Sequence, residues 1–218
     1  MKAKNKKLAR ENYKQFSAFD GSDYIASEFA LETIVDILDR FNITSVLELG
    51  MGIGSVSDTI LKYNETNKKE ILYYGTENNE FFLGALKKNV KDYDKINLFS
   101  ELKEINSQKF NLIIVDGQDM SLNSIETYTK SNTIFFVEGD RSDQTKALKR
   151  IFPKSKHVNV ITLRKNPPYA HGGNSTNNYI GGGQVIFKKP TSKMNYYFLK
   201  EKIRTFVIRK LRSYKKVV

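Results

Sequence analysis

Short apolar runs alternate with amphipathic stretches along most of this chain, and this alternation narrows the folds open to it. Apolar residues at helical spacing predict helices over 23–40, 56–63, 81–90 and 144–152. The runs that we predict as strands are 45–49, 71–76, 96–99, 111–115, 133–137, 157–163 and 184–188. Strands separated by helices need crossover connections, which build a parallel sheet with helices on both faces.

The alternation of strands and helices breaks down between the last two predicted strands. Strands 157–163 and 184–188 have no helix between them, only a loop rich in Gly, Pro and Asn over 166–183. Such a connection predicts a final antiparallel hairpin. The fold class that we predict is therefore α/β, with a mostly parallel seven-stranded sheet and an antiparallel last strand.

The chain of 218 residues is long enough for one α/β domain with short extensions. We predict a basic N-terminal extension over 1–22, the α/β domain over 23–190 and a basic amphipathic helix over 191–218. There is no cysteine, so disulfides and thiolate metal sites are excluded. No apolar run approaches the roughly 20 residues that span a bilayer, and the basic N-terminus lacks the apolar stretch of a secretory signal. We expect a cytoplasmic protein.

The sharpest local motif is Val46-Leu-Glu48-Leu-Gly50-Met-Gly52-Ile-Gly54, which lies where the first strand ends and a helix begins. Glycine lets the backbone turn tightly and approach a ligand closely. Dinucleotide-binding folds favour G-x-G-x-x-G, and here the third glycine comes one residue early. G-x-G-x-G after an acidic residue resembles motif I of the class I, Rossmann-like methyltransferases. The resemblance implies that Glu48 and the three glycines bind S-adenosylmethionine.

Two more acidic residues follow strands at the same edge of the predicted sheet. Glu77 ends the second strand, where a carboxylate can accept hydrogen bonds from two ribose hydroxyls. Asp116 ends the fourth strand, and it resembles the polar residue that this family places beside the methyl group. Open α/β sheets bind ligands outside the carboxyl ends of their strands. The resemblance covers about residues 40–190 and extends the cofactor site to Glu77 and Asp116.

The tetrapeptide Asn166-Pro-Pro-Tyr169 matches a signature of enzymes that methylate adenine amino groups or glutamine amides. In those enzymes it follows the fourth strand, a position that Val115-Asp116-Gly117 already occupies here. We therefore interpret the two prolines as the rigid start of a loop.

The long polar loop 166–183 is predicted to cover the substrate, because loops of this length in compact domains are usually functional or disordered. Proton removal from a hydroxyl needs a general base, for which we name His171 and Asp116 as candidates. The side chains that we expect to bind substrate are Arg141, Tyr169, Asn174 and Tyr179.

Glu138 and Asp140 follow the fifth strand and add carboxylates to this edge. Some methyltransferases of this fold, the catechol type, hold a divalent cation with acids after the fourth and fifth strands. Oxygen ligands would suit magnesium. Because Glu-Gly-Asp replaces the Asp-Asn pair of that family, a divalent cation is possible but not favoured. We therefore predict no metal ligands.

The C-terminal stretch 194–214 has apolar residues consistent with one helical face: Leu199, Ile203, Phe206, Val207, Leu211 and Tyr214. Basic residues occupy much of the rest, and the formal net charge of the chain is +12. Such a helix can lie on an anionic membrane surface, contact nucleic acid, or dock on its own domain or on a second copy in a homodimer. Membrane contact would place the protein at the inner face of the membrane.

Three functions remain open at this stage. We favour an S-adenosylmethionine-dependent O-methyltransferase acting on a small molecule or glycan. The alternatives are an RNA or protein methyltransferase, and a nucleoside-binding scaffold without catalysis.

Overall fold

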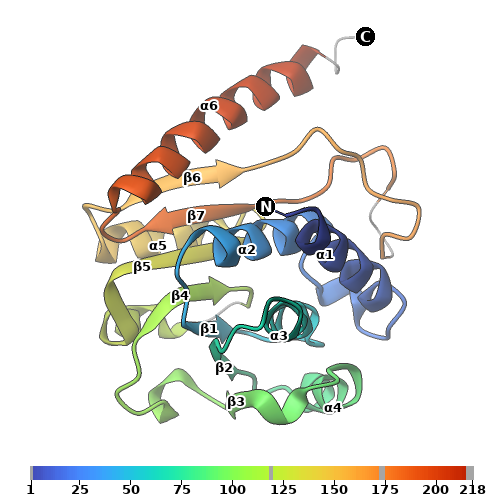
Figure 1. The fold of residues 1–218 in the computed structure, drawn as a ribbon, viewed down its shortest axis with the longest axis vertical. Helices are drawn as coiled ribbons and strands as arrows, with labels where there is room; N and C mark the ends of the chain where they lie inside the picture. Colours follow the sequence, from blue (N-terminus) through green and yellow to red (C-terminus); the bar gives the residue numbers. More distant parts are fainter. Residues whose placement is uncertain (1, 118–119, 172–174, 215–218) are drawn as a thin grey trace.

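The computed structural model describes residues 2–117, 120–171 and 175–214, and one seven-stranded sheet forms its centre (Figure 1). The strand order is β3-β2-β1-β4-β5-β7-β6, with β7 antiparallel to both neighbours and β1 to β5 parallel. The strands are β1 (Ser45–Leu49), β2 (Leu72–Thr76), β3 (Ile96–Phe99), β4 (Phe110–Val115), β5 (Thr129–Glu138), β6 (Lys156–Val160) and β7 (Gly183–Phe187). The predicted fold class is confirmed.

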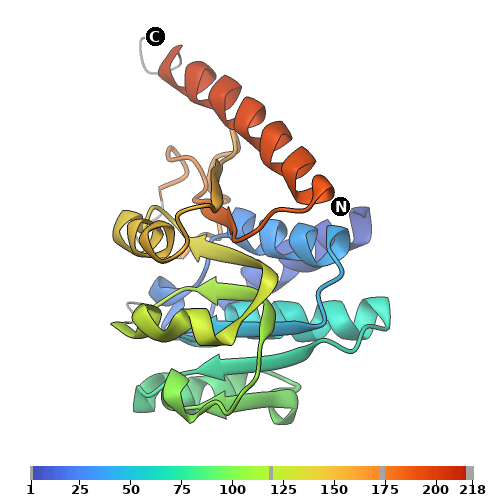
Figure 2. The same cartoon turned by 90° about the vertical axis from the view of Figure 1, so that its left-hand side faces the viewer.

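Helices cover both faces of this sheet, and Figure 2 shows α3 and α5 on opposite sides. The elements are α1 (Ala3–Phe16), η1 (Ser22–Tyr24), α2 (Glu28–Arg40), α3 (Ser55–Asn67), α4 (Glu80–Asn89), η2 (Tyr93–Lys95), η3 (Leu102–Glu104), η4 (Met120–Tyr128), α5 (Ser142–Ile151) and α6 (Ser192–Tyr214), where η marks a 3₁₀ helix. Side chains alternate along β4, so Leu112 and Ile114 join the core under α1 to α4, while Ile113 and Val115 join the core under η4 and α5.

Local signals explain several element ends. The Ser27 hydroxyl caps α2 by accepting from the Ala30 amide at 3.2 Å, and Asn79 caps α4 through the Phe82 amide at 3.3 Å. The sixth strand is shorter than the predicted 157–163. After Val160 the chain turns, with the Thr162 hydroxyl accepting from the Arg164 amide.

The N-terminal stretch contains a helix that we did not predict from the sequence. Within 1–22, which we predicted as a basic extension, α1 packs against α2 and α3. Ala9, Tyr13 and Phe16 are buried at helical spacing. The Asn12 amide nitrogen donates to Ser55 O at 3.1 Å and Thr59 Oγ1 at 2.8 Å. This helix is thus packed against the region of the glycine motif.

Helix α6 crosses the β6 edge of the sheet and continues beyond it (Figures 1 and 2). Within the described part of the chain, no helix combines the length and apolar character needed to cross a bilayer.

Candidate functional site

The loop between β1 and α3 turns on three glycines in the left-handed region, with φ of 78° at Gly50, 52° at Gly52 and 95° at Gly54. Other residues rarely adopt this conformation. A Cβ on Gly50 would lie 2.7 Å from Gly117 Cα, just after β4, and a Cβ on Gly54 would lie 2.5 Å from Val90 Cγ2. The loop therefore fits between the end of β4 and the end of α4 only as glycine.

Glu77 fixes a carboxylate against this loop. Its oxygens accept hydrogen bonds from the amides of Gly52 at 3.0 Å, Asn78 at 3.0 Å and Asn79 at 2.9 Å. A carboxylate has about four acceptor positions, and the Glu77 side chain is only partly buried. It keeps capacity to accept from a ligand hydroxyl beside the glycine loop.

The Glu48 side chain lies inside the domain, where a ligand at the glycine loop would not contact it. Its side chain has no exposed surface, and it accepts hydrogen bonds from Ser57 Oγ at 2.9 Å and from the Tyr73 hydroxyl. Burial raises the pKa of Glu48 well above its usual value. In this conformation Glu48 joins β1, β2 and α3 beneath the glycine loop, which is a supporting position.

Two acids and one arginine meet at the ends of β4 and β5. Arg141 Nη1 donates to Asp116 Oδ1 at 3.0 Å, and its Nη2 lies 3.9 Å from Glu138 Oε2. Glu138 Oε1 also accepts from the Ser27 amide at 3.4 Å. We predicted Arg141 to bind substrate, and in the structure it holds these two carboxylates together.

The electrostatics of this acid pair favour a retained proton. Burial raises the pKa of Glu138 to about 7, with a further upward contribution from Asp116 and an opposing one from Arg141. Burial also raises the pKa of Asp116, against the attraction of Arg141. A carboxyl group that titrates near neutral pH is suited to accept a proton from a substrate.

Residues 17–27, the α1–α2 segment, pass over this edge of the sheet. A Cβ on Gly21 would lie 2.7 Å from Ile53 Cγ2, and one on Gly52 would lie 3.3 Å from the Tyr24 carbonyl oxygen. Farther along, the Ser27 hydroxyl donates to Gly181 O at 2.9 Å. The segment thus runs from the glycine loop to the start of β7.

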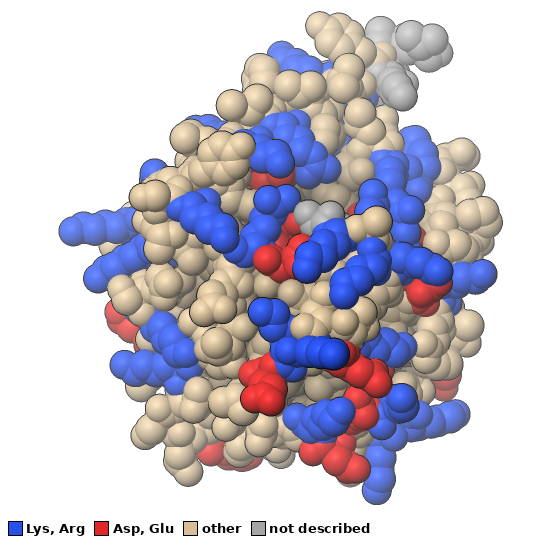
Figure 3. Space-filling view, in the orientation of Figure 1, with Lys and Arg blue, Asp and Glu red and all other residues tan. Residues whose placement is uncertain are grey.

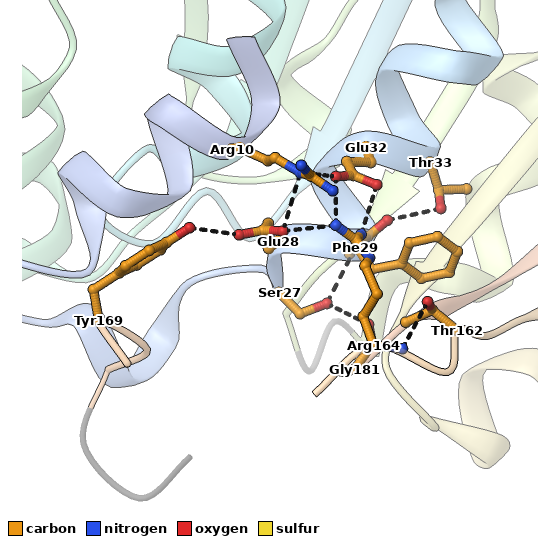
Figure 4. A network of polar contacts seen from close by, with 11 residues as sticks. Arg10, Ser27, Glu28, Phe29, Glu32, Thr33, Thr162, Arg164, Tyr169 and Gly181 are labelled. Carbon is orange, nitrogen blue, oxygen red and sulfur yellow. Dashed lines mark hydrogen bonds and ion pairs between the residues drawn. The ribbon is translucent and has the colours of Figure 1, made fainter. Parts of the chain in front are cut away.

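A buried ion network ties this region to the β6–β7 loop, residues 161–182 (Figure 4). Glu28 and Glu32 of α2 have side chains only 5% and 4% exposed. Arg164 donates to Glu28 at 2.9 Å and to Glu32 at 2.6 Å, and Arg10 of α1 donates to Glu32 at 2.8 Å. Each carboxylate therefore has guanidinium partners, as buried charges require.

The β6–β7 loop is itself paired along its base. The Asn166 amide donates to Asn178 O and the Ile180 amide to Arg164 O, both at 3.0 Å. Tyr179 lies between two cations, with Lys165 Nζ 3.7 Å and the Arg212 guanidinium carbon 4.1 Å from its ring centroid. Tyr179, predicted to bind substrate, thereby links the loop to α6.

Two other predicted side chains contact the N-terminal region. The Tyr169 hydroxyl donates to Glu28 Oε2 at 3.0 Å, and its ring centroid is 6.3 Å from that of Tyr13. His171 Nδ1 lies 3.4 Å from Asp23 Oδ1 on the α1–α2 segment. Asn174 lies outside the described residues. No group of three or more His, Asp or Glu suited to a metal ion occurs among the residues described.

The structure thus brings Gly50, Gly52, Gly54, Glu77 and Asp116 to one edge of the sheet, with Glu48 buried beneath them. Sequence reasoning missed Gly117, whose close approach to Gly50 needs no side chain on either residue. It also missed the raised pKa of Glu138. The sequence did indicate it, because Glu138 directly follows an apolar strand, where a carboxylate is expected to be buried.

Solved structures similar to this fold include several methyltransferases. A putative O-methyltransferase from Klebsiella pneumoniae has a TM-score of 0.55 at 11% identity, over 87% of this chain and 92% of that one. The SAH-bound methyltransferase PaMTH1 from Podospora anserina has 0.55 at 15%, over 84% and 88%. The O-methyltransferase TomG from Streptomyces achromogenes, in complex with SAM, has 0.50 at 10%, over 87% and 92%.

No protein-family model matches the sequence, and no curated protein matches it either. Identities of 10–15% with solved structures establish the fold alone. The chain has the Rossmann-like fold of class I methyltransferases.

Proposed function

We propose that this protein is an S-adenosylmethionine-dependent methyltransferase that acts on a hydroxyl group of a small molecule or glycan. The observation that carries the proposal is the glycine loop bonded to Glu77 through the Gly52 amide, at the carboxyl edge of a parallel sheet. A nucleoside needs a cradle without Cβ atoms and an acceptor for its ribose hydroxyls. These residues supply both.

The residues around the edge fit the cofactor in kind. Gly50 and Gly54 let the loop pack against Gly117 and Val90, and Gly52 adds no side chain beside Glu77. Glu77 offers a fixed carboxylate oxygen. When bound, S-adenosylmethionine supplies an electrophilic methyl group. The remaining task of the chain is to orient an acceptor oxygen and remove its proton.

Glu138 is the group that we assign to proton removal. Its pKa of about 7 leaves a substantial carboxylate fraction at neutral pH, and that carboxylate still binds protons well. Arg141 positions it beside Asp116, which has the stronger contact with the guanidinium at 3.0 Å. His171 and Asp116 were our sequence-based candidates. In this conformation His171 lies against Asp23, and Asp116 accepts a hydrogen bond from Arg141.

The amino-methylating alternative loses its main support. It rested on Asn166-Pro-Pro-Tyr169, which lies after β6 rather than after β4. The Asn166 amide nitrogen donates to Ser175 O at 3.0 Å, and Tyr169 donates to Glu28. Both side chains therefore serve the β6–β7 loop in this conformation.

Isothermal titration calorimetry with S-adenosylmethionine and, separately, with NAD tests the cofactor assignment. We expect binding of S-adenosylmethionine to the wild type, loss of binding in Gly52→Val, and unchanged binding in Gly84→Ala, where a Cβ meets nothing within 4 Å. NAD binding instead of S-adenosylmethionine binding would overturn the assignment. Circular dichroism of each variant separates lost binding from lost folding.

Methyl transfer from radiolabelled cofactor to a panel of hydroxylated small molecules and oligosaccharides tests the acceptor class, with and without magnesium. Incorporation into any of them supports O-methylation. Incorporation only into RNA or protein would assign the alternative class, and cofactor binding without any turnover would favour a scaffold.

A further inference from the structure

Helix α6 docks on the domain through a different face from the one that its apolar residues suggested. Met194, Tyr197, Glu201, Thr205 and Ile208 are its buried residues. Thr205 Oγ1 donates to Asn159 O at 2.6 Å, and the Tyr197 ring packs 5.7 Å from that of Phe41. This docking fixes which side of α6 points outward.

The outward side carries a continuous row of large apolar residues. These residues, which we call the outer stripe, have exposed fractions from 47% to 71%: Tyr196, Leu199, Ile203, Phe206, Val207 and Tyr214. Tyr196 and Ile203 are seven residues apart, as are Leu199 and Phe206, and Val207 and Tyr214, so each pair lies on one side of the helix. Buried Met194 and exposed Ile203 are separated by about two and a half turns, which places them on opposite sides.

Nothing in the described molecule covers this stripe. In Figures 1 and 2, α6 forms an outer edge, and no described element lies beyond it. An exposed apolar row of this length is unusual on a monomeric soluble protein and marks a contact surface.

The charged residues around the outer stripe indicate which kind of partner contacts it. Lys200 lies one turn from Tyr196 on one flank, Lys202 lies one turn before Phe206 on the other, and Lys210 Nζ is 5.8 Å from the Phe206 ring centroid. The sole acid of α6 is Glu201, which is buried and bonded to Arg204 at 2.8 Å. The outward side is therefore apolar along most of its middle, with Lys200 and Lys202 on its two borders. Lys210, seven residues after Ile203, lies in line with the row near the C-terminus of the helix.

Cationic side chains also cover much of the face of the domain that Figure 3 shows. Figure 3 shows Lys and Arg side chains spread over much of the view, while Asp and Glu lie mainly in its middle and lower parts. The net charge of +12 gives the whole molecule an attraction to anionic surfaces.

We propose that the outer stripe and its flanking lysines attach this protein to the surface of an anionic lipid bilayer. An interfacial helix buries its apolar side at the level of the acyl chain boundary, and flanking lysines extend to the phosphate groups. A second copy would bring two cationic borders together with no carboxylate to neutralise them. Nucleic acid would use the lysines but would leave the apolar row in water. An anionic bilayer uses both features.

Vesicle co-sedimentation of the full chain tests the proposal. The vesicles contain either phosphatidylcholine alone or phosphatidylcholine with one third phosphatidylglycerol. The double variant Ile203→Gln/Phe206→Gln removes apolar surface without changing charge and keeps a good helix former at both positions. Leu72→Gln, at a residue 55% exposed on β2, is the matched control.

We expect wild type and Leu72→Gln to sediment with the phosphatidylglycerol vesicles, and the double variant to partition roughly tenfold less. Lys202→Gln/Lys210→Gln should weaken binding to these vesicles and reduce its salt dependence. Equal sedimentation of the wild type and the double variant would overturn the proposal. So would a wild-type dimer in sedimentation velocity without vesicles that becomes a monomer in the double variant, because the stripe would then join two copies. RNA binding at physiological salt that depends on Lys202 and Lys210, without vesicle binding, would also overturn it.

Discussion

At the scale of single residues, the acids of this site divide by burial. Glu77 is held at the surface of the glycine loop by three amides. Glu48, only two residues before Gly50, is fully buried and supports the loop from beneath. Glu138 is intermediate, because burial raises its pKa while Arg141 opposes that rise. In the function that we propose, one residue type therefore supplies a ligand acceptor, a structural support and a proton acceptor.

Replacing Glu48 by glutamine should stabilise the protein at high pH. Burial raises the pKa of Glu48 in the folded state, so folding favours the protonated form, and stability is lost as pH rises above the unfolded pKa of about 4.3. Glutamine keeps the shape without the ionisation. We expect the Tm of Glu48→Gln at pH 8 to exceed that of wild type by about 2–4 °C, for roughly 1 kcal/mol. At pH 4 the difference should nearly vanish. A lower Tm at pH 8, measured by differential scanning calorimetry, would contradict this account.

Replacing Glu138 by glutamine should remove one limb of the pH profile. The wild-type kcat/KM should fall as pH decreases through about 7, because Glu138 acts as a base only when deprotonated. Glu138→Gln should lower kcat roughly 100-fold and make it insensitive to pH in that range. Asp143→Asn, at an exposed acid of α5, is the control and should retain the wild-type profile. A normal profile in Glu138→Gln would assign the base elsewhere.

At the scale of elements, the β6–β7 loop is anchored to α1 and α2 through charge. Arg164 bonds both glutamates of α2, and Arg10 adds the contact from α1. Tyr169 extends the anchoring to the middle of the loop. Breaking such a buried network is costly, because it leaves a charge without its partner in a medium of low dielectric constant.

Arg164→Met should therefore destabilise the protein and release the loop. It keeps the aliphatic stem but leaves Glu28 and Glu32 with Arg10, so we expect the free energy of unfolding to fall by about 2–3 kcal/mol. Urea denaturation measures this loss, and amide hydrogen exchange over 175–181 should accelerate. Arg150→Met, at an exposed position on α5, should change neither quantity by a comparable amount. Equal stability of the two variants would show that the network is not an anchor.

Elements with strong local periodicity could be predicted from the sequence. Strands 45–49 and 96–99 agree with β1 and β3 at both ends, and the glycine spacing located the loop between β1 and α3. The packing of α1 was missed because its basic residues masked the buried row Ala9, Tyr13 and Phe16. The network in Figure 4 joins Arg164 to Glu28 and Glu32, which are more than 130 positions away in the sequence, and no local pattern reveals such a contact.

At the scale of the whole molecule, the two proposed contact regions lie on separate surfaces. The carboxyl edge of the sheet holds the glycine loop, Glu77 and the acid pair, while α6 presents its apolar row away from the domain. The sequence predicted the helix but not the side that docks, because both sides of α6 carry apolar residues. The side that docks is the one that contacts Phe41 and Asn159, and the sequence does not show where these two residues lie.

The central claim is that the glycine loop and Glu77 bind the adenosine part of a sulfonium cofactor. A crystal structure with S-adenosylhomocysteine tests it most directly. The account predicts ribose hydroxyls within hydrogen-bond distance, about 2.6–3.2 Å, of the Glu77 carboxylate, and no side chain between the ligand and Gly50 to Gly54. Clear density for the ligand at any other edge of the sheet, or a ribose without contact to Glu77, would contradict it.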